Sequence, residues 1–438
     1  MIQTIDLRGE TLTPHRLALA VPRAEVDVAK AVESATELID DVRERGMVAL
    51  VEQARRFDGA DPQHLRVPAA DIAAATEGLD PVVRAALEEA IRRVREATGA
   101  QVPGERVTEL GSGARVRQRW QPVARVGLYV PGGKAVYPSS VVMNVVPAQI
   151  AGVASIAIAS PAQREFGGAV HPTILGAAGL LGIEEVYAIG GAGAIAALAY
   201  GVPELDLAPV DVITGPGNVY VAAAKRLVRG VVAIDAEAGP TEILVIADAS
   251  ADPALVAADL VSQAEHDEDA AAVLVTDSPA LAEAVERDLE SRAGLAKHGD
   301  RVRVALESQQ SAIVLVDDLA AAAAFSNAYG PEHLEIQTGD DDAVLALITN
   351  AGAIFVGPDS PVSLGDYLAG SNHVLPTGGQ SRFGSGLGAM AFLRSQQIVE
   401  YTHEGLAAVR DGIVALSNAE DLPAHGEAVL ARFDEHTP

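Results

Sequence analysis

The chain has 438 residues, of which 49% are hydrophobic and 4% aromatic, and its 60 acidic and 32 basic residues give a net charge of −28. A chain of this length suits roughly two to three domains, and its apolar share is enough for a large buried core. The negative charge argues against nucleic acid and anionic membranes as partners, and the absence of cysteine excludes disulfides and thiolate metal sites.

The first residues and the hydropathy of the chain indicate where in the cell the protein is located. The first residues, MIQTIDLRGETLTP, lack the basic and apolar regions of a signal peptide. No unbroken run of about 18 apolar residues occurs, so the sequence predicts no membrane span. We therefore expect a cytoplasmic protein.

The first part of the chain is expected to form an arm and helices. Residues 1–23 read as an extended arm with turn signals and no core of their own. Apolar side chains at steps of three and four residues predict a helix over 24–57, and Asp80 is a plausible N-cap for a second amphipathic helix at 81–98.

From residue 123 onward, short apolar strands alternate with helices. The predicted strands are 126–130, 153–159, 186–189, 210–214, 242–246, 272–276, 312–316 and 353–356. The predicted helices include 194–200, 253–265, 280–292 and 319–327. This alternation indicates crossover connections and parallel sheets, so the predicted fold class is α/β with two Rossmann-like halves. After about residue 388 the pattern becomes irregular and mostly helical.

A carboxylate and an imidazole stand side by side in Gly330-Pro331-Glu332-His333. Neighbouring side chains cannot share one face of a helix or strand, but at the end of an element both can reach one pocket. An imidazole can take a proton from an alcohol at neutral pH, and a carboxylate can take one from water. The alternative is an exposed Glu-His pair at the start of an element.

Three glycine loops follow predicted strands. Gly191 to Ala196 fits the relaxed G-x-G-x-x-A fingerprint, although tight packing of a helix on a strand explains these glycines nearly as well. The loops Tyr129-Val-Pro-Gly-Gly133 and Gly215-Pro-Gly-Asn218 each offer backbone N–H groups and one polar side chain at a strand end. Three such loops in one sheet favour a dinucleotide ligand.

Several scattered side chains form an N/O donor set. Gln263 and His266 are three positions apart on a predicted helix and share a face, and Asp366, His373 and His425 follow. Such ligands suit Zn²⁺ or a similar divalent ion. Spacing alone does not decide between a metal site and histidines whose hydrogen bonds are satisfied in the core.

Taken together, these stretches resemble the histidinol dehydrogenase family, the zinc enzymes that end histidine biosynthesis. The match runs over nearly the whole chain, in the family's order and spacing. The matching stretches are Tyr129-Val-Pro-Gly-Gly133, Tyr137-Pro-Ser-Ser140, Gly215-Pro-Gly-Asn218, Ile234-Asp-Ala-Glu-Ala-Gly-Pro-Thr-Glu242, Gln263-Ala-Glu-His-Asp267, Glu332-His-Leu-Glu335, Ser363-Leu-Gly-Asp-Tyr367, Asn372-His-Val-Leu-Pro-Thr377 and Leu422-Pro-Ala-His425.

The resemblance implies an intertwined homodimer with one Zn²⁺ per subunit. Its ligands would be Gln263, His266 and Asp366 together with the partner subunit's His425. The resemblance also implies a division into an N-terminal arm (1–23), a substrate and zinc domain (24–120 plus 239–387), an NAD-side domain (121–238) and a small C-terminal domain (388–438).

The resemblance further implies which residues meet the substrate and the cofactor. The pocket for L-histidinol would be lined by the zinc ligands together with Thr241, His333, His373 and Glu420, the last of these also from across the dimer interface. Tyr129 and Asn218 would contact NAD.

The implied reaction is two successive hydride transfers to NAD⁺, from L-histidinol through a bound aldehyde to L-histidine. His333 would deprotonate the alcohol and later the hydrated aldehyde, and Glu332 would activate the water that attacks the aldehyde. Zinc would orient the substrate and help retain the reactive aldehyde.

One residue departs from the family pattern. Many members have Gln after Gly-Gly-Ala, where it contacts NAD, but this chain has Gly193. We expect weaker cofactor binding by about 0.5–1.5 kcal/mol, the value of one neutral hydrogen bond, with the chemistry retained. A lower Michaelis constant for NAD⁺ in Gly193→Gln would support this expectation.

Two other functions stay open at this point. One is a related zinc- and NAD-dependent dehydrogenase of another alcohol, against which the retention of Glu420 and His425 argues. The other is a zinc-bound scaffold protein with a lapsed NAD site, indicated only by Gly193.

Overall fold

A computed structural model describes residues 2–24, 28–132 and 136–433. Gly133, the end of the first glycine loop, and residues 25–27 of the predicted first helix lie outside these ranges. The chain divides into two compact units, Met1–Gln101 with Val123–Phe392 and Val102–Pro122 with Leu393–Pro438. No helix in the described ranges is long and apolar enough to cross a membrane.

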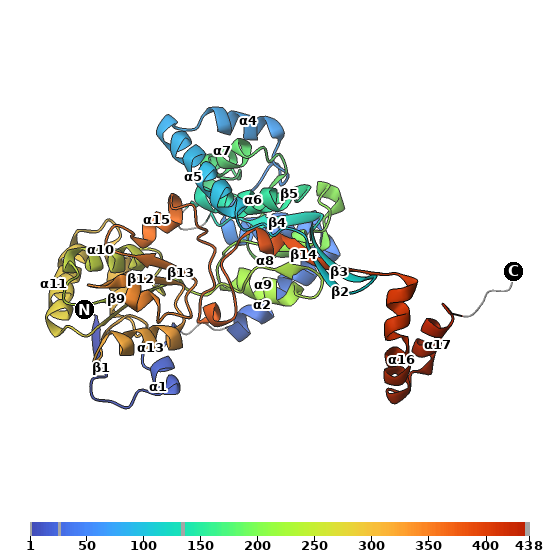
Figure 1. Cartoon of the computed structure of the whole chain (residues 1–438). Coiled ribbons are helices and arrows are strands. Elements are labelled where there is room, and N and C mark those ends of the chain that lie inside the picture. The colour runs from blue at the N-terminus through green and yellow to red at the C-terminus, as the bar shows by residue number, and fades with distance from the viewer. Residues whose placement is uncertain (1, 25–27, 133–135, 434–438) are drawn as a thin grey trace. The chain divides into compact units, whose positions relative to one another are not determined.

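The first unit contains a six-stranded parallel sheet with the order β1-β11-β10-β9-β12-β13 (Figure 1). The strands are β1 (Gln3–Asp6), β9 (Glu242–Ala247), β10 (Ala271–Thr276), β11 (Ala312–Leu315), β12 (His333–Gln337) and β13 (Ala353–Val356). All six residues of β9 are buried, as expected for a central parallel strand whose two faces are both covered.

Helices cover both faces of this sheet. Ile243 and Val245 of β9 pack in a core with α10 (Pro253–Ala264), α11 (Pro279–Leu295) and α12 (Gly299–Glu307). Leu244 and Ile246 pack in a second core with α1 (Pro14–Ala18), α13 (Leu319–Tyr329) and α14 (Asp341–Leu345). The alternation of β9 between the two cores follows from the two-residue period of a strand.

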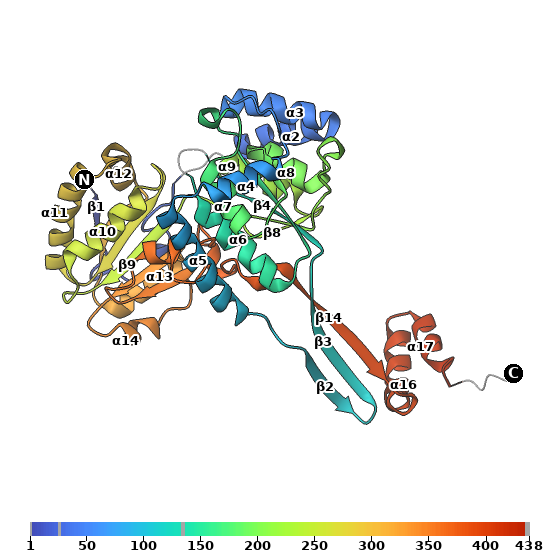
Figure 2. The same ribbon diagram turned by 90° about the horizontal axis from the view of Figure 1, so that it is seen from above.

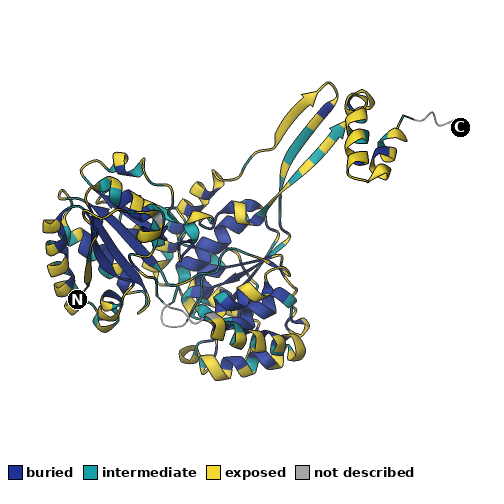
Figure 3. Cartoon of the chain, turned by 90° about the horizontal axis from the view of Figure 1, so that it is seen from below, coloured by how far each residue is buried: buried dark blue, intermediate teal, exposed yellow. Residues whose placement is uncertain are grey.

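A five-stranded parallel sheet, also in the first unit, has the order β6-β5-β4-β7-β8. Its strands are β4 (Arg125–Tyr129), β5 (Ser155–Ser160), β6 (Val186–Ala188), β7 (Val212–Thr214) and β8 (Ala233–Ile234). The inner strands of both parallel sheets are largely buried (Figure 3), whereas the edge strands β1, β8 and β13 are more exposed.

The helices around this second sheet come from both ends of its sequence. Figure 2 shows α2 (Val28–Arg45) beside α8 (Gly191–Tyr200) and α9 (Val219–Val228), and α3 (Met47–Gln53) joins the same core. The other helices are α4 (Ala69–Glu77), α5 (Pro81–Gly99), α6 (Pro138–Ala151), α7 (Pro172–Leu180) and, near the first sheet, α15 (Val362–Tyr367).

The alternating strands and helices predicted from residue 123 to 356 are confirmed, with shifts of a few residues at their ends. The single helix predicted over 24–57 is wrong in its continuity. Gly46 has a φ of 53°, a conformation that glycine adopts without steric cost, and it separates α2 from α3. A π-helical turn, Ala54–Asp58, follows α3.

The second unit has its own antiparallel sheet, which the hydrophobic pattern of the sequence does not predict. Its strands are β2 (Arg106–Gly111), β3 (Ala114–Pro122) and β14 (Leu393–Tyr401), in the order β14-β3-β2. Two helices follow, α16 (His403–Ala419) and α17 (Pro423–Leu430). The expectation of a mostly helical region after residue 388 is therefore wrong for β14, whose polar residues hide the strand pattern.

Candidate active site

Glu332 and His333 lie where α13 gives way to β12. Gly330, with a φ of 61°, ends α13 in the left-handed region, Pro331 follows, and His333 is the first residue of β12. Only 6% of Glu332 and 5% of His333 is exposed. The exposed-pair alternative is therefore wrong, because both side chains point into the protein.

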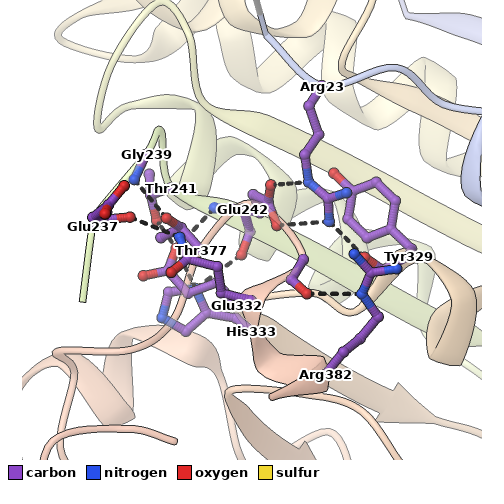
Figure 4. Close-up of polar contacts among 12 residues, drawn as sticks. Arg23, Glu237, Gly239, Thr241, Glu242, Tyr329, Glu332, His333, Thr377 and Arg382 are labelled. Atoms are coloured by element: carbon purple, nitrogen blue, oxygen red, sulfur yellow. Dashed lines mark hydrogen bonds and ion pairs between the residues drawn. The ribbon is translucent and has the colours of Figure 1, made fainter. Parts of the chain in front are cut away.

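The Glu332 carboxylate is held by two donors through one oxygen (Figure 4). Thr241 Oγ1 donates to Oε2 at 2.6 Å, and the backbone N–H of Glu242 donates to the same atom at 2.9 Å. Burial nevertheless raises the pKa of Glu332 to about 8. Near neutral pH most of this carboxyl group is therefore protonated, and its ionised form, which grows as the pH rises toward about 8, is a strong base for its class.

The hydrogen bond of His333 determines its tautomer. Nδ1 lies 3.0 Å from the carbonyl oxygen of Glu242, and a carbonyl oxygen can only accept. Nδ1 therefore carries the proton in the neutral ring, and Nε2 keeps its lone pair. Burial lowers the pKa of His333, which favours this neutral, proton-accepting form.

Gln263 and His266 lie at the C-terminal end of α10, at the same edge of the sheet as the starts of β9 and β12. Gln263 is buried, and its Nε2 donates to Thr241 Oγ1 at 2.7 Å, which leaves Oε1 as the amide atom available to a metal. His266 Nε2 lies 3.9 Å from Oδ2 of Asp366 on α15. Thr241 thus links Gln263 to Glu332.

His373 lies beside the same residues and connects them to the second parallel sheet. Its Nδ1 is 3.0 Å from the carbonyl oxygen of Asp366, so Nδ1 donates. Its Nε2 is 3.2 Å from Oγ of Ser140 on α6, whose hydroxyl then donates to the ring. Ser140 lies in a family-like stretch but was not assigned a role from the sequence.

The donor set within the first unit suits a zinc ion but is incomplete. Two ligands at Zn–N and Zn–O lengths of about 2.0–2.2 Å lie at most ~4.2 Å apart, and His266 and Asp366 meet that limit. The described residues contain no group of three His, Cys, Asp or Glu side chains that could hold a metal. A site with two such ligands and one glutamine needs a further donor.

Glu420 and His425 belong to the second unit. Glu420 is the C-cap residue of α16 and His425 lies in the first turn of α17, and both are exposed. Their assignment to the site stays a prediction.

The residues predicted to contact NAD gather at the carboxyl edge of the second parallel sheet. The Tyr129 hydroxyl, at the end of β4, accepts from the N–H of Gly191 at 3.2 Å, and Asn218 caps α9 through Oδ1. The buried Lys225 binds the carbonyl oxygen of Gly215 at 3.1 Å and pairs with Asp235. This edge, at the switch between β4 and β7, is where open α/β sheets bind nucleotides.

Gly193 lies in α8 against α3. A Cβ atom added at this position would collide with Oε1 of Gln53 and lie 3.2 Å from Cδ2 of Leu50. The glycine therefore permits the close approach of the two helices, and its effect on NAD binding stays a prediction.

Comparison with known proteins identifies the family. A family model described as histidinol dehydrogenase matches residues 21–433. The chain belongs to the histidinol dehydrogenase family. This family catalyses the final step of histidine biosynthesis, so the chain is an oxidoreductase, and zinc and NAD are the cofactors that the family uses.

Individual histidinol dehydrogenases match over nearly their full length. One from Leifsonia xyli subsp. xyli is 70% identical over 434 residues, which are 99% of this chain and 100% of that protein. One from Nocardia farcinica is 58% identical over 433 residues, 98% of this chain and 97% of that protein. The crystal structure of histidinol dehydrogenase from Elizabethkingia anophelis has a TM-score of 0.91 and 32% identity, covering 99% of this chain and 98% of that chain.

Proposed function

We propose that this site oxidises L-histidinol to L-histidine in two hydride transfers to NAD⁺, with Glu332 and His333 as its proton-transfer residues. The supporting observation is the buried pair itself. One residue is a carboxylate with a raised pKa, and the other is a neutral imidazole whose Nδ1 is blocked by a carbonyl. Two bases of different strength suit the two oxidation steps.

His333 is proposed to act through Nε2. In the first oxidation this atom takes the hydroxyl proton of the alcohol as hydride leaves the adjacent carbon. In the second oxidation, Nε2 takes a hydroxyl proton of the hydrated aldehyde. Each step needs a neutral imidazole with a fixed orientation, and the bond to the Glu242 carbonyl supplies the orientation.

Glu332 is proposed to prepare the second oxidation. Its Oε2 is occupied by Thr241 and the N–H of Glu242, so Oε1 is the atom that would take a proton from water. The resulting hydroxide attacks the bound aldehyde and forms the hydrate. Side-chain rotation of Glu332 is restricted by its two donors, which keeps the base in place for this step.

The zinc ligands proposed here are Gln263, His266 and Asp366 with the partner subunit's His425, and zinc bound there supplies an electrophilic anchor for the amino and imidazole nitrogens of the substrate. The 3.9 Å separation of His266 and Asp366 and the free amide oxygen of Gln263 support the first three ligands. Thr241, His373 and the partner subunit's Glu420 would complete the substrate pocket.

The cofactor is proposed to bind along the carboxyl edge of the second sheet and, when bound, to supply the hydride acceptor. Asn218 is exposed at the N-terminus of α9, where backbone N–H groups and the helix dipole favour a phosphate. Tyr129 would lie under the cofactor, and Gly193 would leave more room than the glutamine of other members. The Ser140–His373 bond joins this edge to Asp366, one of the proposed zinc ligands.

A homodimer is proposed because the second unit has almost no core of its own. Its buried described residues are Ala114, Gly405, Ser417 and Gly426, all of them small. Several of its large apolar side chains are 40–66% exposed, namely Val107, Leu110, Val399, Val409, Leu416, Leu422 and Leu430. Apolar surface of this kind marks an interface, and a second copy of the chain would cover it.

The reaction is tested by incubating the zinc-loaded protein with L-histidinol and NAD⁺ and following NADH absorbance. We expect two NADH for each L-histidine formed, and nearly none with His333→Asn. A faster reaction with another amino alcohol would favour the related-dehydrogenase alternative. Absence of NADH with every alcohol tested, despite bound zinc, would favour the scaffold alternative.

A further inference from the structure

An ion pair joins the N-terminal arm to the first residue of β9 (Figure 4). Arg23 Nε lies 2.6 Å from Oε1 of Glu242, and Nη2 lies 3.4 Å from Oε2. The Glu242 residue is only 3% exposed, so its carboxylate depends on Arg23 for charge compensation. Burial and this partner act in opposite directions on the pKa of Glu242, with burial the larger cause.

Arg23 also holds the end of α13. Nη2 donates to the carbonyl oxygen of Tyr329 at 2.6 Å, and the guanidinium lies 4.1 Å from the centroid of the Tyr329 ring. Tyr329 is the last residue of α13, three positions before Glu332. One side chain thus bridges the start of β9 and the segment that leads into β12.

The Glu242 peptide contacts both members of the proposed catalytic pair. Its N–H donates to Oε2 of Glu332, and its carbonyl oxygen accepts from Nδ1 of His333. Any displacement of the start of β9 therefore moves the base that activates water and the base that accepts the alcohol proton. The two catalytic contacts come from the backbone, while the carboxylate of the same residue faces Arg23.

We propose that Arg23 is a positioning residue for the reaction: by clamping Glu242 and Tyr329 together, it sets Glu332 and His333 in their productive geometry. This inference rests on the proposed function. It gives the N-terminal arm, whose sequence carries no functional motif, a part in the reaction. Stability alone is a weak reason for such a pair, because desolvation of the buried Glu242 and the half-buried Arg23 offsets much of their attraction.

The test compares three variants with the wild-type enzyme. Arg23→Met keeps the apolar stem and removes the cation. Arg23→Lys keeps the charge but cannot bind Glu242 and Tyr329 together through a planar fork. Arg125→Met is the matched control, because Arg125 pairs with Glu185 at the opposite edge of the second sheet and is also partly buried.

For each variant, kcat, KM for L-histidinol, zinc content and the unfolding temperature are measured. We expect Arg23→Met to lower kcat about 10- to 100-fold, the effect of a small misplacement of catalytic groups. KM and zinc content should stay near the wild-type values. Arg23→Lys should lie between, and Arg125→Met should lower the unfolding temperature without lowering kcat. Wild-type kcat in folded Arg23→Met would overturn the proposal.

A second comparison separates positioning from stability. In Arg23→Met with Glu242→Gln, no buried carboxylate is left unpaired, so the unfolding temperature should recover while kcat stays low. Recovery of both would show that the clamp acts on stability alone. If Arg23→Met does not fold, the Arg23→Lys variant decides, and wild-type kcat there contradicts the proposal.

Failure of this inference is distinguishable from failure of the proposed function. If the function is wrong, the wild-type enzyme forms no NADH from L-histidinol. If only the inference is wrong, the wild-type enzyme is active and the Arg23 variants are as active as Arg125→Met.

Discussion

Hydrogen bonds to the backbone select which atoms of Glu332 and His333 can accept a proton in the proposed reaction. The carbonyl oxygen of Glu242 keeps a proton on Nδ1 of His333, and the N–H of the same residue occupies Oε2 of Glu332. One nitrogen and one carboxylate oxygen therefore remain for the substrate and water. The chemistry proposed for each residue follows from the atom that its neighbours leave available.

We predict that Glu332→Gln slows oxidation of the aldehyde far more than oxidation of the alcohol. Loss of a general base costs about 10²- to 10⁴-fold, and only the aldehyde step needs an activated water. The two half-reactions can be measured separately by starting from L-histidinol or from the aldehyde. Equal losses in both would contradict the role assigned to Glu332.

The pH dependence of aldehyde oxidation should report the same carboxylate. Burial raises the pKa of Glu332 to about 8, and the base must be ionised to act, so the rate should rise as the pH increases toward that value. Zinc held by the proposed ligands would favour the carboxylate form, so in the loaded enzyme we expect the midpoint at or below about 8. Glu332→Gln should lose this limb, and its persistence there would assign it to another group.

At the scale of single elements, α10 and β12 each contribute one residue to a second pair of acids. Asp259 on α10 and Glu335 on β12 interact electrostatically, and Glu335 is fully buried. Burial, and then the charge of Asp259, raises the pKa of Glu335 to about 9. In the folded protein Glu335 therefore keeps its proton at neutral pH.

This pair predicts a pH dependence of stability. A raised pKa gives a contribution that is complete below the unfolded-state pKa of about 4.5 and is lost as the pH rises through about 9. Glu335→Gln keeps a donor for Asp259 but cannot ionise, so it should unfold with less dependence on pH. We expect it to be more stable than the wild type by about 1–4 kcal/mol at pH 8.

Urea unfolding at several pH values between 5 and about 9 measures this difference. The exposed Glu283 on α11 provides a control, because Glu283→Gln should leave the pH dependence unchanged. Parallel curves for the wild type and Glu335→Gln would show that the pair shares no proton.

The packing of α3 on α8 changes the test proposed for Gly193. A side chain at position 193 would collide with Gln53, so Gly193→Gln alone should lower the free energy of unfolding by about 1–3 kcal/mol, the usual cost of overpacking. Combining it with Gln53→Ala removes the collision and should recover part of the stability, because the hydrogen bond from Gln53 Nε2 to the carbonyl oxygen of Leu38 is lost. We expect tighter NAD⁺ binding only in the double variant, measured by titration. Equal NAD⁺ affinity in the wild type and the stable double variant would remove Gly193 from the cofactor site.

An element can be predicted from the sequence when it packs in a large hydrophobic core, because its residues then follow an apolar pattern. Eight strands of the two parallel sheets are short apolar runs near glycine or proline, and the sequence predicts them. It does not predict β1, β8 and β12, because QTID and HLEIQ mix polar with apolar residues and β8 has only two residues. β3 and β14 were missed because their sequences, ARVRQRWQP and LRSQQIVEY, are mostly polar. They form a sheet without a large apolar core, so their strands lack the periodicity on which prediction relies.

The candidate site was predictable only where side chains carry the chemistry. Glu332, His333 and the ligand set have recognisable residue types, but Glu242 acts through its peptide group, which any residue would provide. Arg23 lies in an arm with no pattern, some 219 positions from its partner. Ser140 became visible only through its contact with His373.

At the scale of the whole molecule, the proposed dimer makes a prediction about mixed subunits. If His425 acts in the partner's site, co-expressed His333→Asn and His425→Asn chains form heterodimers with one intact site. Random pairing places half of all dimers in this class, so about a quarter of the wild-type activity should return. Each variant alone should be nearly inactive.

The control for this experiment co-expresses His333→Asn with Glu332→Gln, two changes within the same proposed half-site, which should not complement. Light scattering checks that all the proteins are dimeric. Lack of recovery in the first mixture, with heterodimers present, would place His425 in the site of its own chain or outside it.

Because Glu242 contacts the pair through its peptide group, different kinds of mutation at this position should be tolerated differently during evolution. A substitution cannot remove the backbone carbonyl, and only proline removes the N–H. The two contacts to Glu332 and His333 are therefore retained in most substitutions of Glu242. A deletion or insertion of one residue just before β9 is different, because it would turn the neighbouring peptide toward the pair and invert the strand's two faces. Insertions and deletions just before β9 should therefore be tolerated less well than substitutions at position 242.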